Sequence, residues 1–520
     1  MNIRDMMRRS AQFHADKPAI IAGESRLTFA EAWQRGCRMA NLLLSMDLKP
    51  GDAVASLEDN TLEAVDFFLG AAIANITRVP LYARNARSSH QYMMEHTHCK
   101  AVIVAEHYAD QLEGMNNELP ELDHIIVRQN SQYEDWLASF PDTDPDVAVD
   151  PEQNYVIRHT GGTTGKPKGV AFTHRSWLEI GRNWFFTLPP VSPGDVCMHI
   201  APISHASGYM FVPIWLMGGV NLVVEKYQAD AVVDLMEQDK VAYMFVAPTM
   251  VNDIMQVEGV AEKDWSGLKC LMIGAAPITE ASVRKAHAIW GDALCQLYGQ
   301  SEGVPVTMTM ASEWVTEVEG SKPLRSLGKV HPFCEVEIRD PETHQALPYG
   351  EEGEICFRND GQMTGYWENP EASAKTVIRG FIHTGDVGYL DQNGYLYMFD
   401  RKDDMILSGG YNIWPTELEN VLATHEQAVE VVAFGVPHDR FGESPYAIVM
   451  VKDPAAVNEQ ELIDMCATEL GSYKKPIKVE IQTTPLPRTP VGKMSRKLIR
   501  APYWEAVSYT HLTLPTKRIV

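Results

Sequence analysis

The first 150 residues alternate between helical and strand-like patterns of apolar positions. Apolar residues within 27–44 recur at helical spacing, and 53–57 is a short apolar run that follows a Gly-Asp turn. Asn60 is placed to cap a second helix, and 79–81 and 101–104 are further short apolar runs. Strands that alternate with helices predict a parallel sheet with crossover helices. The expected fold class is therefore α/β.

Two later stretches extend this pattern. Residues 155–157 and 170–173 are apolar runs on either side of a Gly-rich loop, which predicts a strand–loop–strand hairpin. Nearer the C-terminus, 416–422 has a helical pattern, and 431–434 and 447–450 have the pattern of strands in a small α+β domain. Because 520 residues are many for a single hydrophobic core, we expect two or more domains.

The loop of the predicted hairpin consists almost entirely of Gly, Thr, Lys and Pro, in the order Thr160-Gly161-Gly162-Thr163-Thr164-Gly165-Lys166-Pro167-Lys168-Gly169. Glycines let backbone N–H groups approach a ligand closely, and N–H donors together with lysines suit a polyphosphate. The Walker pattern does not fit, because Pro167 stands where that motif has its metal-binding hydroxyl. For such a loop taken alone, a flexible and solvated turn is the alternative interpretation.

Composition and charge narrow the class of protein. The net charge of −24, from 45 basic and 69 acidic residues, disfavours nucleic acid as a partner but not a small anion. The eight cysteines form no C-x-x-C pair, so we expect reduced core residues rather than a zinc site or a disulfide framework. The N-terminus has no apolar signal region, and Pro and Gly interrupt the longest apolar run, 209–224. We therefore expect a soluble, cytoplasmic enzyme without a transmembrane segment.

Five further segments combine small, hydroxyl and charged residues in specific orders: Pro202-x-x-His205-x-x-Gly208, Gly274-Ala275-Ala276-Pro277, Tyr298-Gly299-Gln300-Ser301-Glu302, Thr384-Gly385-Asp386 and Pro487-Arg488-Thr489-x-x-Gly492-Lys493. Each also has an ordinary structural interpretation. A lone His in an apolar neighbourhood is usually a satisfied core residue, Asp is common in turns, and exposed lysines usually only solubilise.

Taken together and in this order, the motifs resemble those of the adenylate-forming enzymes, which include acyl- and aryl-CoA synthetases, luciferases and the adenylation domains of peptide synthetases. The Gly-rich loop of that family usually contains Thr-Ser-Gly-Thr-Thr-Gly-x-Pro-Lys-Gly, so Gly161 replaces a Ser and removes one hydroxyl donor. The resemblance covers Thr160 to Arg496.

The resemblance implies a set of nucleotide-binding residues. The phosphates of ATP are assigned to Thr160, Gly161, Gly162, Thr163, Thr164, Gly165 and Lys168. Adenine is assigned to Gly274, Ala275, Ala276, Pro277, Tyr298 and Gly299, with Tyr298 stacked on the ring. Asp386 is the acceptor for both ribose hydroxyls, and Arg401 contacts the ribose or the phosphates. Glu302 is the ligand of Mg²⁺.

The resemblance also implies residues for the chemistry and for coenzyme A. Lys493 is the catalytic lysine, Ser301 supplies a hydroxyl donor, and His205 is a gate beside the carboxylate of the acid. Gly409 and Gly410 line the tunnel for the pantetheine arm of coenzyme A. Relatives that activate amino acids carry an Asp near His205, and its absence here argues for a substrate without an α-amino group.

The same resemblance implies how the chain divides. We expect a large, layered N-terminal AMP-binding domain at 1–399, a hinge at 400–404 centred on Asp403, and a small, mobile C-terminal domain at 405–505. Residues 508–520 have no helical period and match no motif, and they resemble translated sequencing-adapter read-through. We interpret them as a foreign tail.

These observations predict an ATP-dependent ligase that joins a carboxylic acid to coenzyme A through an acyl-adenylate, with Mg²⁺, releasing AMP and pyrophosphate. The sequence segments around His205 and Glu302 most resemble those of fatty-acyl-CoA synthetases, which favours a fatty acid as substrate. An aryl acid is the alternative substrate. A luciferase-like oxygenase and an inactive nucleotide-binding relative are further alternatives. The expected partners are small molecules, and a homodimer is left open.

Overall fold

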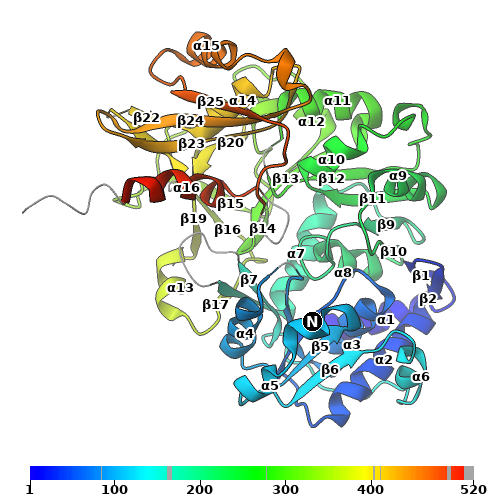
Figure 1. The fold of residues 1–520 in the computed structure, drawn as a ribbon. Coiled ribbons are helices and arrows are strands. Elements are labelled where there is room, and N and C mark those ends of the chain that lie inside the picture. Colours follow the sequence, from blue (N-terminus) through cyan, green and yellow to red (C-terminus); the bar gives the residue numbers. More distant parts are fainter. Residues whose placement is uncertain are drawn as a thin grey trace, which may run out of the picture.

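The computed structural model describes residues 1–83, 85–160, 167–276, 278–401, 404–409, 411–488 and 494–508. Within these residues the strands form four sheets, two large ones in the N-terminal part, a smaller one beside them and one near the C-terminus. Figure 1 shows the C-terminal sheet, in orange, above the blue and green layers of the N-terminal part. The expected α/β class is confirmed.

The first large sheet has the strand order β17-β8-β7-β4-β3-β5-β6. Its strands are β3 (Ala53–Leu57), β4 (Thr77–Pro80), β5 (Ala101–Ala105), β6 (His124–Arg128), β7 (Asn154–Thr160), β8 (Lys168–Thr173) and β17 (Gly365–Tyr366). Strands β4, β3, β5 and β6 pair in parallel, as the alternating pattern predicted, whereas β7 and β8 form the predicted antiparallel hairpin. The Gly-rich loop therefore joins two paired strands.

The second large sheet has the order β14-β13-β12-β11-β9-β10-β1-β2. Its strands are β1 (Pro18–Ala22), β2 (Ser25–Thr28), β9 (Val196–His199), β10 (Val220–Val223), β11 (Val241–Val246), β12 (Cys270–Ile273), β13 (Leu294–Gln300) and β14 (Gly303–Met310). Strands β10, β9, β11, β12 and β13 run parallel, and β14 turns back antiparallel to β13. The turn between β13 and β14 carries Ser301 and Glu302.

The two smaller sheets are mainly antiparallel. One contains β15 (Glu335–Arg339), β16 (Gly353–Arg358), β18 (Val377–Ile378), β19 (Phe381–Leu390) and β20 (Leu396–Arg401). The C-terminal sheet contains β21 (Ile406–Ser408), β22 (Tyr411–Ile413), β23 (Ala428–His438), β24 (Gly442–Val451) and β25 (Lys478–Gln482). Helices α14 and α16 contact β23, and α15 contacts β25. The α+β pattern predicted for this region is confirmed.

The helices cover these sheets. They are α1 (Ile3–Phe13), α2 (Phe29–Ser45), α3 (Leu62–Ala74), α4 (Arg87–His96), α5 (Met115–Glu118), α6 (Tyr133–Ala138), α7 (His174–Thr187), α8 (Gly208–Leu216), α9 (Ala229–Gln238), α10 (Pro248–Ile254), α11 (Glu280–Trp290), α12 (Ala311–Trp314), α13 (Pro370–Thr376), α14 (Pro415–Leu422), α15 (Glu459–Leu470) and α16 (Arg496–Ser508). Short 3₁₀ turns include Glu106–Leu112, Val260–Glu262, Gly291–Ala293, Pro323–Arg325 and Pro454–Ala456.

The predicted cap of the second helix is wrong by one residue. Thr61 is the N-cap of α3, and its side chain accepts from the backbone N–H of Ala64. The amide of Asn60 is used elsewhere, since it donates to the carbonyls of His199 and Ala201 and accepts from the N–H of Ile203. Asn60 therefore ties α3 to the segment that leads to His205.

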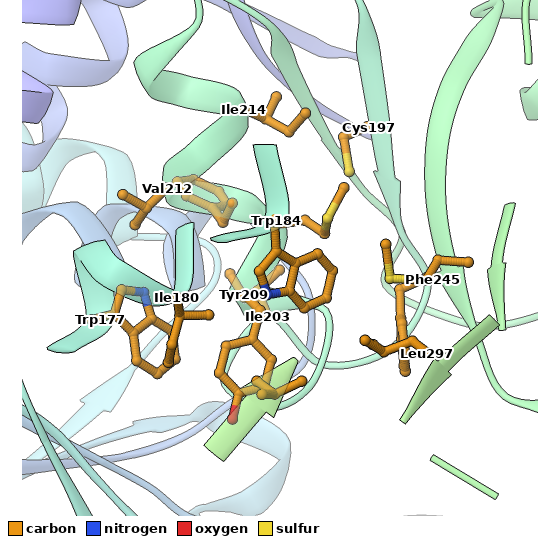
Figure 2. Packing of buried hydrophobic residues seen from close by; sticks show 14 of the residues in the cluster. Trp177, Ile180, Trp184, Cys197, Ile203, Tyr209, Val212, Ile214, Phe245 and Leu297 are labelled. Carbon is orange, nitrogen blue, oxygen red and sulfur yellow. The ribbon is translucent and has the colours of Figure 1, made fainter. Parts of the chain in front are cut away.

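The core that lies beside this segment is rich in aromatic residues. Figure 2 shows Trp177, Trp184 and Tyr209 gathered near Ile203, with Phe245 and Leu297 across from them. Trp177 and Tyr209 stack with ring centres 5.0 Å apart. All eight cysteines are buried and free, which agrees with the expectation of reduced core residues. Burial and packing of helices α7 and α8 thus build one wall of the region around His205.

Candidate functional site

Asp386, the predicted ribose acceptor, is held by two side chains from strand β13. The hydroxyl of Tyr298 donates to Asp386 Oδ2 at 2.6 Å, and the amide of Gln300 donates to the same oxygen at 2.8 Å. Gln300 also donates to the carbonyl of Thr384 at 3.0 Å. Asp386 is only 3 % exposed, so these donors replace much of the water that the carboxylate would otherwise bind. The motifs around Tyr298 and Asp386, far apart in sequence, therefore meet.

The turn before Asp386 is fixed by the backbone. Gly385 has φ +71°, in the left-handed region that favours glycine, and its N–H donates to Glu354 Oε1 at 3.0 Å. The hydroxyl of Thr384 accepts from the N–H of Asp386 and donates to the carbonyl of Ile355. Each residue of the Thr-Gly-Asp motif thus has a structural part in orienting the carboxylate.

Glu302, the predicted Mg²⁺ ligand, lies at the turn after β13 and is half-buried. Its Oε1 accepts from the hydroxyl of Tyr366 at 2.7 Å. Among the residues that the structure describes, none donates a hydrogen bond to Oε2. Burial and the charge of Glu302 raise the pKa of Tyr366, so that tyrosine stays a proton donor. A half-buried carboxylate with one oxygen anchored in this way fits a magnesium ion, which prefers hard oxygen ligands.

Tyr366 also links Glu302 to the Gly-rich loop. The ammonium of Lys168 lies 4.6 Å from the centre of the Tyr366 ring, a cation–π contact. Tyr366 belongs to β17, which pairs with β8, and the N–H of Trp367 donates to the carbonyl of Gly169 at 2.7 Å. Lys168 and Glu302 therefore both contact Tyr366, one at its ring and the other at its hydroxyl.

His205 lies in a segment between β9 and α8 that is pinned at several points. Its ring meets Tyr82 edge to face with centres 5.7 Å apart, and its carbonyl accepts from Arg158 at 3.5 Å. Gly208 closes the segment, and a Cβ there would lie 1.8 Å from the carbonyl oxygen of Ile203, so no larger residue fits. The half-buried His205 side chain is thus held where the segment turns toward β7.

Arg158 was not predicted from the sequence, although it stands two residues before Thr160. It is 3 % exposed, donates to the hydroxyl of Tyr209, and lies over the rings of Tyr209 and Trp177 at 4.5 and 5.2 Å. No described carboxylate forms an ion pair with it. A buried cation held by ring faces beside His205 gives this region a positive charge that no motif signals.

The predicted adenine segment follows β12. A Cβ on Gly274 would lie 2.9 Å from the carbonyl oxygen of Leu297, so the glycine permits close packing against β13. Ala275 has φ +72°, and both Ala275 and Ala276 are exposed. Exposed small side chains at the carboxyl ends of parallel strands are compatible with a flat ligand. Tyr298, expected to stack on that ligand, is 9 % exposed and is anchored through its hydroxyl.

The structure brings together part of the predicted site. Thr160 and Lys168 face each other across β7 and β8, and Arg401 is opposite Asp386 in the ladder of β19 and β20. Gly409 lies in the turn between β21 and β22 of the C-terminal sheet. Gly299 lies in β13, and Ser301 in the turn after it. The predicted residues that lie outside the described ranges are Gly161, Gly162, Thr163, Thr164, Gly165, Pro277, Asp403, Gly410 and Lys493.

Comparisons with known proteins identify the family. A model of the AMP-binding enzyme family matches residues 7–367, and a model of the AMP-binding enzyme C-terminal domain matches 417–493. The chain belongs to the AMP-binding enzyme family. Two similar relatives are the long-chain-fatty-acid–CoA ligase FadD13 of Mycobacterium tuberculosis, 30 % identical over 96 % of this chain and 98 % of the relative, and a feruloyl-CoA synthase of an Amycolatopsis species, 30 % identical over 95 % and 97 %.

Solved structures agree with this AMP-binding fold. ATP-bound MatB of Rhodopseudomonas palustris is similar with a TM-score of 0.88 and 25 % identity, over 97 % of this chain and all of that one. A large N-terminal and a small C-terminal domain are confirmed, whereas the exact boundaries at 399, 404 and 405 stay predictions. Searching the described residues for an apolar helix of bilayer-spanning length finds none.

The family match and the CoA-ligase relatives together indicate the class of reaction. The protein is an acid–thiol ligase that forms AMP, and its cosubstrates and cofactor are ATP, coenzyme A and Mg²⁺. The acid is not fixed by these comparisons, because relatives of the same identity act on fatty acids and on an aryl acid.

Proposed function

We propose that the enzyme activates a fatty acid to its CoA thioester through a fatty acyl-adenylate. The sequence around His205 and Glu302 favours a fatty acid among the possible acids. The observation that supports adenylation is a pair of side-chain anchors. One holds Asp386 through Tyr298 and Gln300, and the other joins Glu302 to Lys168 through Tyr366. An acceptor suited to ribose and a cation–carboxylate pair suited to phosphates thus come from three sheets, with Asp386 on β19, Lys168 on β8 and Glu302 after β13.

The residues act through charge and position rather than as a general base. A carboxylic acid with a pKa near 4 is ionised at neutral pH, so its attack on the α-phosphate of ATP joins two anions. Lys168 offsets the phosphate charge, and Lys493 is assigned the same task at the carboxylate. Glu302 would hold Mg²⁺, which reduces the negative charge on the phosphates. Asp386 fixes the ribose and therefore the α-phosphate.

In the second half-reaction the thiol sulfur of coenzyme A attacks the acyl carbon. The bond between the acyl carbon and the phosphate oxygen then breaks, and AMP leaves with the electron pair of that bond. The half-buried His205, beside the aromatic wall of α7 and α8, is assigned to the entrance of the acyl pocket. Gly409 and Gly410 are assigned to the pantetheine tunnel.

An aryl acid is the second candidate substrate, favoured by one feature. Trp177 and Trp184 both stack on Tyr209, with ring centres 5.0 and 6.0 Å apart, and the three rings form an aromatic wall near Ile203. Aromatic walls of this kind bind planar rings by stacking.

A pyrophosphate-release screen tests the proposal. Unbranched acids of graded length, simple aryl acids and α-amino acids are compared with and without coenzyme A, and the acyl-CoA product is measured directly. We expect the highest kcat/KM with a fatty acid, and little release with amino acids because the segment 201–208 carries no Asp to pair with their ammonium. Preference for aryl acids would select the second candidate, while the best turnover with a free amino acid would contradict both.

A further inference from the structure

Three side chains that the nucleotide site does not use converge beside the Thr-Gly-Asp turn. His344 comes from the connection between β15 and β16, Glu354 from β16 and His383 from β19. Each offers one nitrogen or oxygen atom, and the three atoms lie within 4.8 Å of one another. Such a set is of the size and composition that a divalent transition metal requires.

The hydrogen bonds of His383 leave one ring nitrogen unused. Its side chain is 5 % exposed, and Nδ1 lies 2.9 Å from Glu354 Oε2. Nε2 is buried and has no hydrogen-bond partner among the described residues. When Nδ1–H donates to the carboxylate, the neutral ring presents a lone pair on Nε2. A buried acceptor without a partner is costly unless something binds to it.

His344 presents a second unused nitrogen to the same place. Its ring meets that of His383 edge to face, with centres 5.0 Å apart, and its Nδ1 is buried without a partner among the described residues. The backbone N–H of His344 donates to the carbonyl of Asp340, which closes the turn and holds the ring over β19. The two rings that are in contact therefore each carry one buried nitrogen without a partner among the described residues.

Glu354 completes the arrangement. Its Oε1 accepts from the N–H of Gly385 and its Oε2 from His383, so the carboxylate is fixed on both sides. A carboxylate that holds the far nitrogen of a histidine is the usual support of a metal-binding imidazole, because it sets the tautomer and raises the basicity of the ring.

We propose that His344 and His383, supported by Glu354, bind a divalent transition metal of the zinc class. Imidazole nitrogens favour Zn²⁺, Co²⁺, Ni²⁺ and Cu²⁺ over Mg²⁺, so this site is chemically distinct from Glu302. The bound metal cross-links the turn after β15 to β19, and Glu354 joins β16 to the site through His383. Since Glu354 also holds Gly385, the site is connected to the turn that orients Asp386.

Metal titration of the full chain tests the site independently of the ligase activity. The protein is stripped with a chelator and kept in excess Mg²⁺, and Zn²⁺ is titrated in competition with a chromophoric chelator. The variants are His344→Ala and Glu354→Gln, and the control is His287→Ala, at a half-buried histidine of α11 outside the cluster. The control matters because the chain has 17 histidines, and surface imidazoles outside the proposed site can also take up metal.

We expect wild type and His287→Ala to bind one tight equivalent of Zn²⁺ that His344→Ala lacks, and Glu354→Gln to bind it on the order of 10- to 100-fold more weakly. Zn²⁺ should raise the Tm of wild type but not of His344→Ala. With Co²⁺, the visible spectrum should show nitrogen and oxygen ligands without a thiolate band. Equal stoichiometry in wild type and His344→Ala would overturn the proposal, and the two rings would then be a packing contact only.

Discussion

Asp386 depends on partners that a local motif cannot reveal. Its hydrogen bond to Gln300 spans 86 positions of sequence, and the bond between Glu302 and Tyr366 spans 64. The sequence predicted Asp386 and Glu302 because their immediate neighbours form recognisable motifs. It did not predict Gln300, Tyr366 or Arg158, because their importance arises only when separate strands are brought side by side.

Replacing Asp386 tests the assignment of the ribose site. Asp386→Ala removes a buried acceptor, and a hydrogen bond to a charged group contributes about 1.5–3 kcal/mol. We expect the KM for ATP to rise on the order of 10- to 100-fold, with a smaller effect on the KM for the acid. Asp360→Ala, at an exposed aspartate, is the control. Unchanged ATP affinity in Asp386→Ala would mean that other residues hold the ribose.

Buried histidines predict how stability depends on pH. Burial lowers the pKa of His199 from 6.5 to about 4, and its two ring nitrogens form hydrogen bonds with the side chains of Ser207 and Asn221. The pKa of His199 in the folded state lies below its value in the unfolded state. Its contribution to the free energy of unfolding is therefore fully present above pH 6.5 and is lost as the pH falls toward 4. Each such group contributes a slope of up to about 1.4 kcal/mol per pH unit in that window.

We therefore expect Tm to fall as the pH is lowered from 7.5 to 5, measured by differential scanning calorimetry. His199→Asn should lower Tm at pH 7.5 but show a smaller further loss on acidification than wild type. His287→Asn, at a half-buried position of α11, should follow the wild-type curve. An identical loss in wild type and His199→Asn would show that His199 does not contribute to the acid sensitivity.

Among the elements, strands and helices were easier to predict than their arrangement. The apolar runs at 53–57 and 101–104 are β3 and β5 as expected, because short buried strands need continuous apolar sequence. The order of strands in each sheet was not predicted, since it depends on which buried faces fit together. The N-cap of α3 likewise depends on distant residues. The amide of Asn60 donates to the carbonyls of His199 and Ala201, and Thr61 is the cap instead.

The contact between α2 and α3 gives a prediction at this scale. A Cβ on Gly70 would lie 2.4 Å from Cγ of Met39, and one on Gly36 would lie 2.8 Å from Cβ of Leu69. The two glycines therefore let the helices approach closely. Gly70→Ala should overfill the contact and cost about 1–3 kcal/mol, seen as a lower Tm.

Gly267→Ala is the control for this helix contact, because a Cβ there meets nothing closer than 3.8 Å. It should change Tm much less than Gly70→Ala. Equal Tm values for the two variants would show that α2 and α3 move apart at little cost.

For the whole molecule, the C-terminal boundary was predicted only approximately. Ser508 was assigned to the foreign tail, but helix α16 continues to Ser508. Within that helix, Tyr503 donates to Glu480 at 2.9 Å and Trp504 donates to the carbonyl of Gly435 at 2.9 Å. Residues 509–520 lie outside the described ranges, so their origin stays a prediction.

Two deletions separate the helix from the tail. Removing 509–520 should leave Tm and activity nearly unchanged, because no apolar periodicity ties that segment to a core. Removing 501–520 also takes away Tyr503 and Trp504, and should lower the Tm of the C-terminal domain by several degrees. A large loss with the shorter deletion would show that 509–520 belongs to the native fold.

The last prediction concerns the two half-reactions and the two domains. Lys168 and Glu302 belong to the large domain, whereas Gly409 and Lys493 belong to the small one. If the surfaces of Lys493 and Gly409 serve the same acyl-adenylate, rotation at Asp403 would present them in turn, because hinge residues absorb large changes in φ and ψ. Lys493→Ala should then cripple acyl-adenylate formation and spare thioester formation from supplied acyl-adenylate.

A proline at the hinge should have the reverse effect. Asp403→Pro fixes φ near −65° and should block the rotation, so that the adenylate forms and the thioester does not. Asp403→Ala keeps rotation free and controls for loss of the side chain, and Lys475→Ala, at an exposed lysine of the small domain, controls for loss of charge. Pyrophosphate exchange reports the first half-reaction, and acyl-CoA formed from synthetic adenylate reports the second. Equal damage to both half-reactions in Lys493→Ala and Asp403→Pro would refute domain alternation, because a fixed arrangement would then serve both steps.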